Sequence, residues 1–251
     1  HVDAYVYCDV GRAAENYTET GSRISPYRSL SAAVTAKLTN ANTDFVIFML
    51  APGDYVGTIA IDQQNRNQGF AIVGSGRESC FIKGHTGTFD ATVGNVLYFR
   101  DFLDVSIRDC TIRLGAYGLY TRDTHAVTIT NCRFRFLGPD GWEHDFSTTS
   151  AEQAAHWNAR GTANAHRSDG GAMRIRGSSN VRISNCEVSY TLRGYRIQDC
   201  AEGHITNCSA SWTLESAFYL ASGSYTGDIN YGCNNFQITG CKATDIFHQP
   251  F

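Results

Sequence analysis

Short stretches of alternating apolar and polar residues recur along the chain with a fixed period. Five six-residue segments align without gaps and end in cysteine, here the ladder cysteines: VSIRDC at Cys110, VTITNC at Cys132, VRISNC at Cys186, GHITNC at Cys208 and FQITGC at Cys241. Two of the spacings are 22 residues, and the other two, 54 and 33 residues, equal one such unit plus an insertion. The period predicts a solenoid of coils of about 22 residues.

Each column of this repeat has one chemical character. An isoleucine stands three residues before every ladder cysteine, and an apolar residue stands two residues after it. The position directly before the cysteine holds Asp109, Asn131, Asn185, Asn207 or Gly240. These residue types tolerate the left-handed backbone region best. We therefore expect a sharp turn at this column and stacked isoleucine and cysteine side chains inside the coil.

A second strand of each coil is visible in five further segments: VLYFR (96–100), GLYTR (118–122), AMRIR (172–176), GYRIQ (194–198) and AFYLA (217–221). Strand side chains alternate between the two faces, so the apolar positions point inward. The first outward column then holds Tyr98, Tyr120, Arg174, Arg196 and Tyr219. The second outward column holds Arg100, Arg122, Arg176, Gln198 and Ala221. Together they predict one contiguous surface rich in Arg and Tyr.

With these columns the chain resembles the pectin-lyase-like superfamily of right-handed parallel β-helices, over roughly residues 45–245. The resemblance implies an all-β fold with three short strands per coil and an asparagine ladder at a two-residue turn. It also implies that the second strand carries the substrate groove. The signatures of leucine-rich repeats and of left-handed hexapeptide helices are missing from the sequence.

Two structural units are expected, residues 1–44 and residues 45–251. In the first unit, Leu30, Ala33, Val34 and Leu38 recur at helical spacing and predict a helix that caps the β-helix. The second unit is the β-helix itself, and no C-terminal cap is visible after Cys241. A solenoid end exposes core residues. We therefore expect a homo-oligomeric partner or further C-terminal coils to cover the open end.

Two insertions interrupt the repeat, at about residues 137–170 and 222–232. The first precedes the AMRIR strand and contains Trp157, His166 and Asp169. Loops of this length in a regular solenoid are often functional. Two interpretations of this insertion remain open: it forms a wall beside the groove, or it is a flexible surface loop. No compact ligand spacing supports a metal, calcium included, so no cofactor is expected.

Composition narrows the classes of partner. The net charge is -3, so bulk charge predicts no nucleic-acid partner. No apolar run reaches the length of a membrane span. Nine cysteines are present, and Cys200 and Cys233 share one column in consecutive coils, which leaves a disulfide open. Arg and Tyr on a flat face suit an acidic polysaccharide, which places the protein outside the cell or on a virion surface.

Three functions remain open. A polysaccharide lyase or uronate epimerase is favoured: Arg174 and Arg196 would neutralise the carboxylate, and Tyr120, Tyr219 or His166 would act as the acid. The resemblance implies that an arginine sometimes serves as the base. A glycoside hydrolase would use the carboxylates of Asp169 and Glu215. A non-catalytic fibre or glycan-binding protein would need only the repeat and the contiguous surface rich in Arg and Tyr. The residues expected to bind substrate are Tyr98, Arg100, Arg122, Arg176, Arg193 and Trp157. Arg193 and Glu215 are alternatively a surface ion pair.

Overall fold

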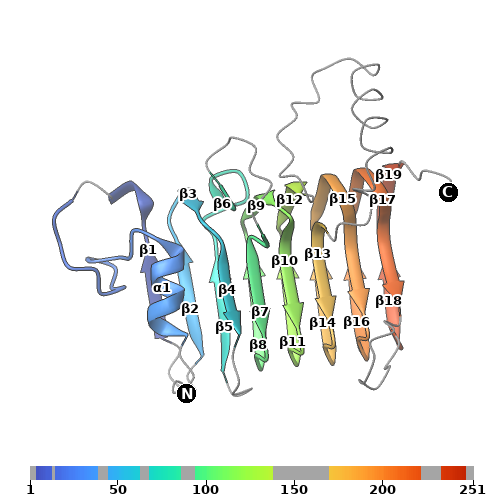
Figure 1. The fold of residues 1–251 in the computed structure, drawn as a ribbon, viewed down its shortest axis with the longest axis horizontal. Coiled ribbons are helices and arrows are strands. Elements are labelled where there is room, and N and C mark those ends of the chain that lie inside the picture. Colours follow the sequence, from blue (N-terminus) through green and yellow to red (C-terminus); the bar gives the residue numbers. More distant parts are fainter. Residues whose placement is uncertain are drawn as a thin grey trace, which may run out of the picture.

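The computed structural model describes residues 4–12, 15–38, 45–62, 68–85, 94–137, 170–221 and 233–246. Within them the chain forms a row of stacked coils that runs from the N-terminal helix at one end to the last strands at the other (Figure 1). All strand pairings in this part of the chain are parallel and join equivalent strands of neighbouring coils. The predicted all-β parallel β-helix is confirmed.

One eight-stranded sheet forms the first side of the coils. It contains the five strands that directly precede the ladder cysteines and three earlier strands. In spatial order they are β1 (Ala4–Cys8), β2 (Val46–Leu50), β5 (Gly69–Val73), β8 (Asp104–Arg108), β11 (Ala126–Thr130), β14 (Asn180–Ser184), β16 (Glu202–Thr206) and β18 (Phe236–Thr239).

The other two sides belong to one sheet that folds around a corner. The first side, here the β12 face, contains β3 (Gly53–Val56), β6 (Cys80–Lys83), β9 (Thr111–Gly115), β12 (Arg133–Leu137) and β19 (Lys242–Ile246). The second side, here the β10 face, contains β4 (Ile59–Asp62), β7 (Leu97–Arg100), β10 (Tyr117–Arg122) and β13 (Gly171–Arg176). The long strands β15 (Glu187–Gln198) and β17 (Ser209–Ala221) run through both sides. Three strand segments per coil are therefore present, as predicted.

The corner before the ladder cysteines has the predicted left-handed backbone. Its residues have φ between 52° and 64°. The side chains also stack, since Asn131 Nδ2 donates a hydrogen bond of 2.6 Å to Asp109 Oδ1 in the preceding coil. Short polar side chains suit this conformation because they can bond locally, and glycine adopts it without strain.

Two further corners are left-handed in several of the described coils. The corner that follows the β10 face has φ between 51° and 65° and contains Asp101, Asp123, Gly177 and Asp199. The corner between the β12 and β10 faces has φ between 52° and 63° and contains Leu114, Phe136, Tyr190, Trp212 and Asp245. Bulky apolar residues are rare in this region, where the strain costs about 1–2 kcal/mol per residue. Rings that stack from coil to coil offset part of this strain: Phe136 lies 5.4 Å from Tyr190, and Tyr190 lies 6.0 Å from Trp212.

The core contains the columns that the repeat predicts. Ile107, Ile129 and Ile205 are fully buried, and the inward residues of β10 and β13 are buried with them. The ladder cysteines stack in the same core, with Sγ atoms 3.9 Å apart between Cys110 and Cys132. All nine cysteines are free thiols. The disulfide left open between Cys200 and Cys233 is therefore absent, and burial raises the pKa of Cys200 to about 12.

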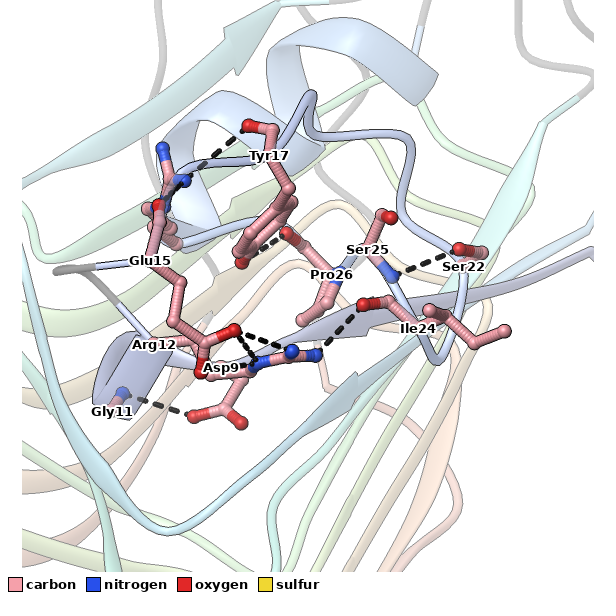
Figure 2. A network of polar contacts seen from close by, with 10 residues as sticks. Asp9, Gly11, Arg12, Glu15, Tyr17, Ser22, Ile24, Ser25 and Pro26 are labelled. Atoms are coloured by element: carbon pink, nitrogen blue, oxygen red, sulfur yellow. Dashed lines mark hydrogen bonds and ion pairs between the residues drawn. The ribbon is translucent and has the colours of Figure 1, made fainter.

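The N-terminal cap is also confirmed. Helix α1 (Leu30–Lys37) begins at Ser29, whose Oγ accepts a hydrogen bond from the Ala32 amide. The predicted apolar stripe of this helix belongs to the buried core. The segment before it folds back on β1 and on the short helix η1 (Val10–Arg12), held by polar contacts between Arg12, Glu15 and the Ile24 carbonyl oxygen (Figure 2).

The coil at the opposite end is less covered. Ile238 is 45% exposed, whereas Ile205, its partner in the preceding coil, is fully buried. A solenoid buries each coil against its neighbours, so an outer coil keeps one apolar side uncovered. The expected partner or further coils at this end remain a prediction. Among the described residues, no helix is long and apolar enough to cross a membrane.

Candidate functional site

The first outward column of the β10 face forms in the predicted register. Tyr98 pairs with Tyr120, Tyr120 with Arg174, Arg174 with Arg196, and Arg196 with Tyr219. Neighbouring strands lie about 4.8 Å apart, so the column spans about 19 Å across five coils. We call these five residues the Tyr/Arg column. It is long enough to follow several units of an extended polymer.

Aromatic rings and guanidinium groups contact one another along this column. Tyr98 and Tyr120 meet edge to face, with ring centroids 5.3 Å apart. The guanidinium carbon of Arg174 lies 5.0 Å from the centroid of the Tyr120 ring, and that of Arg196 lies 5.8 Å from the Tyr219 ring. Both distances fall within the range of cation–π attraction. Each arginine therefore has a tyrosine neighbour in the adjacent coil.

Hydrogen bonds fix the orientation of the two arginines. Arg174 Nε donates to Gln198 Oε1 at 3.0 Å, and Arg196 donates from a terminal guanidinium nitrogen to the Tyr117 hydroxyl oxygen at 3.0 Å. Tyr117 is almost fully buried. Neither Tyr117 nor Gln198 was among the predicted catalytic or substrate-binding residues, although Gln198 was placed in the second outward column. Tyr117 stands seven residues after Cys110, and its place directly before the groove strand was the available signal.

The second outward column differs from the predicted surface of exposed arginine side chains. Arg100 lies within 3.6 Å of the carboxylates of Asp62, Asp101 and Asp123. Arg122 pairs with Asp123 at 3.1 Å. These carboxylates come largely from the corner that directly follows the strand. Arg100 and Arg122 therefore have intramolecular counter-charges, and their role in substrate binding remains a prediction.

The prediction that this column is exposed fails most clearly for Arg176 and Gln198, which are only 8% and 7% exposed. Arg176 pairs with Asp199 at 3.5 Å, and Asp199 is itself 8% exposed. A nearly buried ion pair keeps both charges away from solvent. The contiguous surface is therefore narrower than predicted and centres on the Tyr/Arg column.

The remaining candidates fall into two groups. Arg193 and Glu215 form an ion pair between neighbouring coils, as the second interpretation of these residues predicted. Trp157, His166 and Asp169 lie outside the described residues, as do most of the first insertion and all of the second. In the part of the chain that the structure describes, no group of His, Cys, Asp and Glu side chains could hold a metal ion.

Electrostatics favour a neutral phenol at one end of the column. Burial raises the pKa of Tyr98, with a further contribution from the carboxylate of Asp62. Tyr98 thus remains protonated at neutral pH and can donate a hydrogen bond. Positive guanidinium groups beside phenol donors form a surface that can bind carboxylate and hydroxyl oxygens at the same time.

Comparisons with known proteins bear on the fold. A family model described as "Right handed beta helix region" matches residues 71–249. Among solved structures, a pectin methylesterase from carrot superposes with a TM-score of 0.51 and 13% identity, covering 97% of this chain and 64% of the other. A protein of Geobacillus virus E2, ORF18, has a TM-score of 0.30 at 12% identity, with 96% and 62% coverage. The chain thus spans less than two thirds of either structure. A comparison with curated protein sequences finds no match.

Proposed function

The chain belongs to the right-handed β-helix family, and from that premise we propose that it is a carbohydrate-active protein that binds an acidic polysaccharide along the Tyr/Arg column. The polymer would run across the strands of the β10 face, parallel to the axis of the coils. Such a substrate places the protein at the cell exterior or on a virion surface.

The observation that carries the proposal is the oriented pair Arg174 and Arg196 in adjacent coils. Each guanidinium group has a ring beside it and a hydrogen bond that holds it in place. Arginine presents a planar set of donors that matches a carboxylate in two-point contact. Tyrosine supplies apolar ring surface for a sugar and a hydroxyl group for its oxygens. The arrangement therefore suits a polymer with repeated carboxylate groups.

A uronate lyase or epimerase is the reaction class that these residues support best. The C5 proton of a uronate becomes acidic only when its carboxylate is neutralised, because negative charge moves onto that group as the proton leaves. Arg174 and Arg196 would provide this neutralisation. In a lyase, one of the two arginines would take up the C5 proton as the base, as the resemblance to the family implies, while the other neutralises the carboxylate. The C4–oxygen bond then breaks and the leaving oxygen takes up a proton, with Tyr120 or Tyr219 as the donor. In an epimerase, a proton returns to C5 from the other side.

The glycoside hydrolase alternative has less support among the described residues. That reaction needs two carboxyl groups on opposite sides of the scissile bond, one of them free to donate a proton. Asp62, Asp101, Asp123, Asp199 and Glu215 all pair with arginines. A hydrolase would therefore depend on residues such as Asp169, outside the described part of the chain.

Product analysis separates the three functions. The protein is incubated with pectate, alginate, chondroitin and capsular polysaccharides. We expect new ultraviolet absorbance from an unsaturated product, or altered uronate stereochemistry if the enzyme is an epimerase. New reducing ends without either change would indicate a hydrolase. Binding without any product would indicate a structural or glycan-binding fibre.

Variants then test the site. Arg174→Ala combined with Arg196→Ala should lower kcat/KM at least about 100-fold, since each charge-assisted contact contributes roughly 1.5–3 kcal/mol. The matched control is Arg182→Ala, which removes an exposed arginine of β14 on the eight-stranded sheet. An unchanged kcat/KM in the double variant would reject the assignment.

A further inference from the structure

A second basic column lies on the β12 face, away from the Tyr/Arg column. Lys83, Arg113 and Arg135 stand in register in three consecutive coils. The column continues with Ser189 and Ser211 in the next two coils. Three cations followed by two hydroxyl groups thus line one strip of the sheet. Like charges on neighbouring strands repel each other, so this arrangement is unfavourable without a counter-ion.

The two arginines of this strip have no ion pair with a carboxylate among the described residues. Lys83 pairs with Asp54, and Arg133, two residues before Arg135, contacts both Glu78 and Glu187. By contrast, Arg113 lies 4.9 Å from the ring of Phe81, and its Nε atom is buried without a hydrogen-bond acceptor in this part of the structure. Buried guanidinium donors normally have partners. The Nε–H group of Arg113 is therefore left without an acceptor in this part of the structure.

Arg135 is held at the edge of an aromatic ridge. Its guanidinium carbon lies 5.3 Å from the Phe136 ring and 5.5 Å from the Tyr190 ring, and its Nε donates to Ser189 Oγ at 3.2 Å. The ridge continues to Trp212 by ring stacking. These rings occupy left-handed corner positions, which aromatic residues adopt only under strain. Backbone strain beside a cation that has no ion pair within the described part of the chain supports a hypothesis of function.

We propose that Arg113 and Arg135 form a second binding site, for a saccharide that carries carboxylate or sulfate groups. The two guanidinium groups bind the anionic group, Ser189 holds Arg135 in place from below the surface, Ser211 lies further along the strip, and the aromatic ridge forms one wall. The site differs from the Tyr/Arg column in its residues and in the side of the coils on which it lies, although the long strands β15 and β17 contribute to both, so a long acidic polymer can be held on two sides of the same coils.

Calorimetric titration tests this site apart from the first. The titrants are oligogalacturonate, a chondroitin sulfate oligosaccharide, a neutral malto-oligosaccharide and inorganic sulfate. The protein is the full chain carrying Arg174→Ala and Arg196→Ala, so that the Tyr/Arg column does not contribute. We expect this variant still to bind at least one of the two anionic saccharides. Adding Arg113→Gln and Arg135→Gln should weaken that binding at least about tenfold. Arg182→Gln is the matched control and should leave the affinity unchanged.

Several outcomes overturn the inference. They are no binding before the Gln substitutions, unchanged affinity after them, equal affinity for the neutral sugar, or inorganic sulfate binding as tightly as the saccharides. Variants with Lys at both positions keep the charge and should retain most of the affinity, which separates a lost charge from a lost fold. Because the Tyr/Arg column is already disabled, failure here leaves the proposed function intact, and failure of the proposed function leaves this site intact.

Discussion

The β10 and β12 faces carry basic columns of the same residue type, yet the residue that follows each arginine differs. On the β10 face, Arg100 and Arg122 are followed by Asp101 and Asp123, and the corner carboxylates fold back on the arginines. On the β12 face, Arg113 and Arg135 are followed by Leu114 and Phe136. One left-handed corner thus supplies counter-charge, whereas the other supplies apolar side chains. The number of cations on a face therefore does not by itself determine the charge that the face presents, because the adjacent corner can add carboxylates.

The largest effect is expected where the corner carboxylate is most buried. Asp199→Asn keeps a residue that tolerates the left-handed turn but removes the negative charge beside Arg176. Breaking a nearly buried ion pair should destabilise the fold by about 2–3 kcal/mol. The measurement is the midpoint of urea unfolding at neutral pH. Glu202→Gln, at an exposed position of β16, is the control and should change stability by less than about 0.5 kcal/mol.

A loss as small as that of the control would show that Asp199 does not compensate Arg176. In that case the corner carboxylates would not account for the difference between the two faces.

The second prediction concerns a variant in which the corner after the β12 face receives a carboxylate, like the corner that follows the β10 face. Phe136→Asp places a carboxylate directly after Arg135, as Asp123 follows Arg122. Binding of an anionic saccharide at Arg113 and Arg135 should weaken about tenfold in calorimetric titration, because the new carboxylate competes for the guanidinium groups. Phe136→Asn is the matched control, since it removes the ring and accepts the same backbone without adding charge. Equal losses in both variants would show that the ring, and not the absence of counter-charge, decides binding.

A smaller effect is expected in the pH dependence of stability, which should differ between variants at two arginines of strand β12. Arg133 binds Glu78 and thereby lowers the pKa of that carboxyl group. A lowered carboxyl pKa means that the pair contributes stability above the ordinary pKa of glutamate, and that this contribution is lost as the pH falls through the lowered value. Arg133→Gln should therefore destabilise the protein at pH 7 and much less in acid, near pH 3.

Arg135→Gln should show a clearly smaller difference between the two conditions, because Arg135 has no ion pair with Glu78 and contributes less than Arg133 to the lowered pKa of that carboxyl group. Thermal unfolding of both variants and the wild type from pH 7 down to the acid range provides the measurement. A parallel pH dependence for the two variants would show that Arg135 also has a carboxylate partner.

The smallest effect is the repulsion between Arg113 and Arg135. A double-mutant cycle with Gln at both positions should give an unfavourable coupling of about 0.2–1 kcal/mol at low salt, which disappears at high salt. The cycle removes the separate contributions of Phe81, Phe136 and Tyr190 from the result. A favourable coupling would mean that the two groups already share an anion or a carboxylate.

Much of the fold was predictable because it follows from the backbone preference of single residues and from the spacing of the repeat. The cysteine spacing gave the length of the coil, and alternation gave the inward columns of β10 and β13. Asn, Asp and Gly before the ladder cysteines gave the left-handed corner, since few other residues accept it. The helical spacing of Leu30, Ala33, Val34 and Leu38 gave α1. These features depend on local preference and on repetition, both of which can be read from the chain.

The candidate site was predictable in register but not in charge. The Tyr/Arg column follows directly from strand alternation, whereas the ion pairs of Arg100 and Arg176 depend on how the next corner folds back. The aromatic corner was not predicted, because Phe136, Tyr190 and Trp212 are poor residues for a left-handed backbone. Their constant position four residues after a ladder cysteine was the available signal. Tertiary stacking overrode the local preference there.

The most direct measurement is equilibrium binding of the wild-type protein to pectate, alginate and a neutral glucan of similar length at 150 mM salt. The account predicts that at least one acidic polymer binds, that the neutral glucan does not, and that Arg174→Ala with Arg196→Ala weakens acidic binding at least about tenfold. Equal retention of acidic and neutral polymers, or acidic binding that is unaffected by the double substitution, would contradict it.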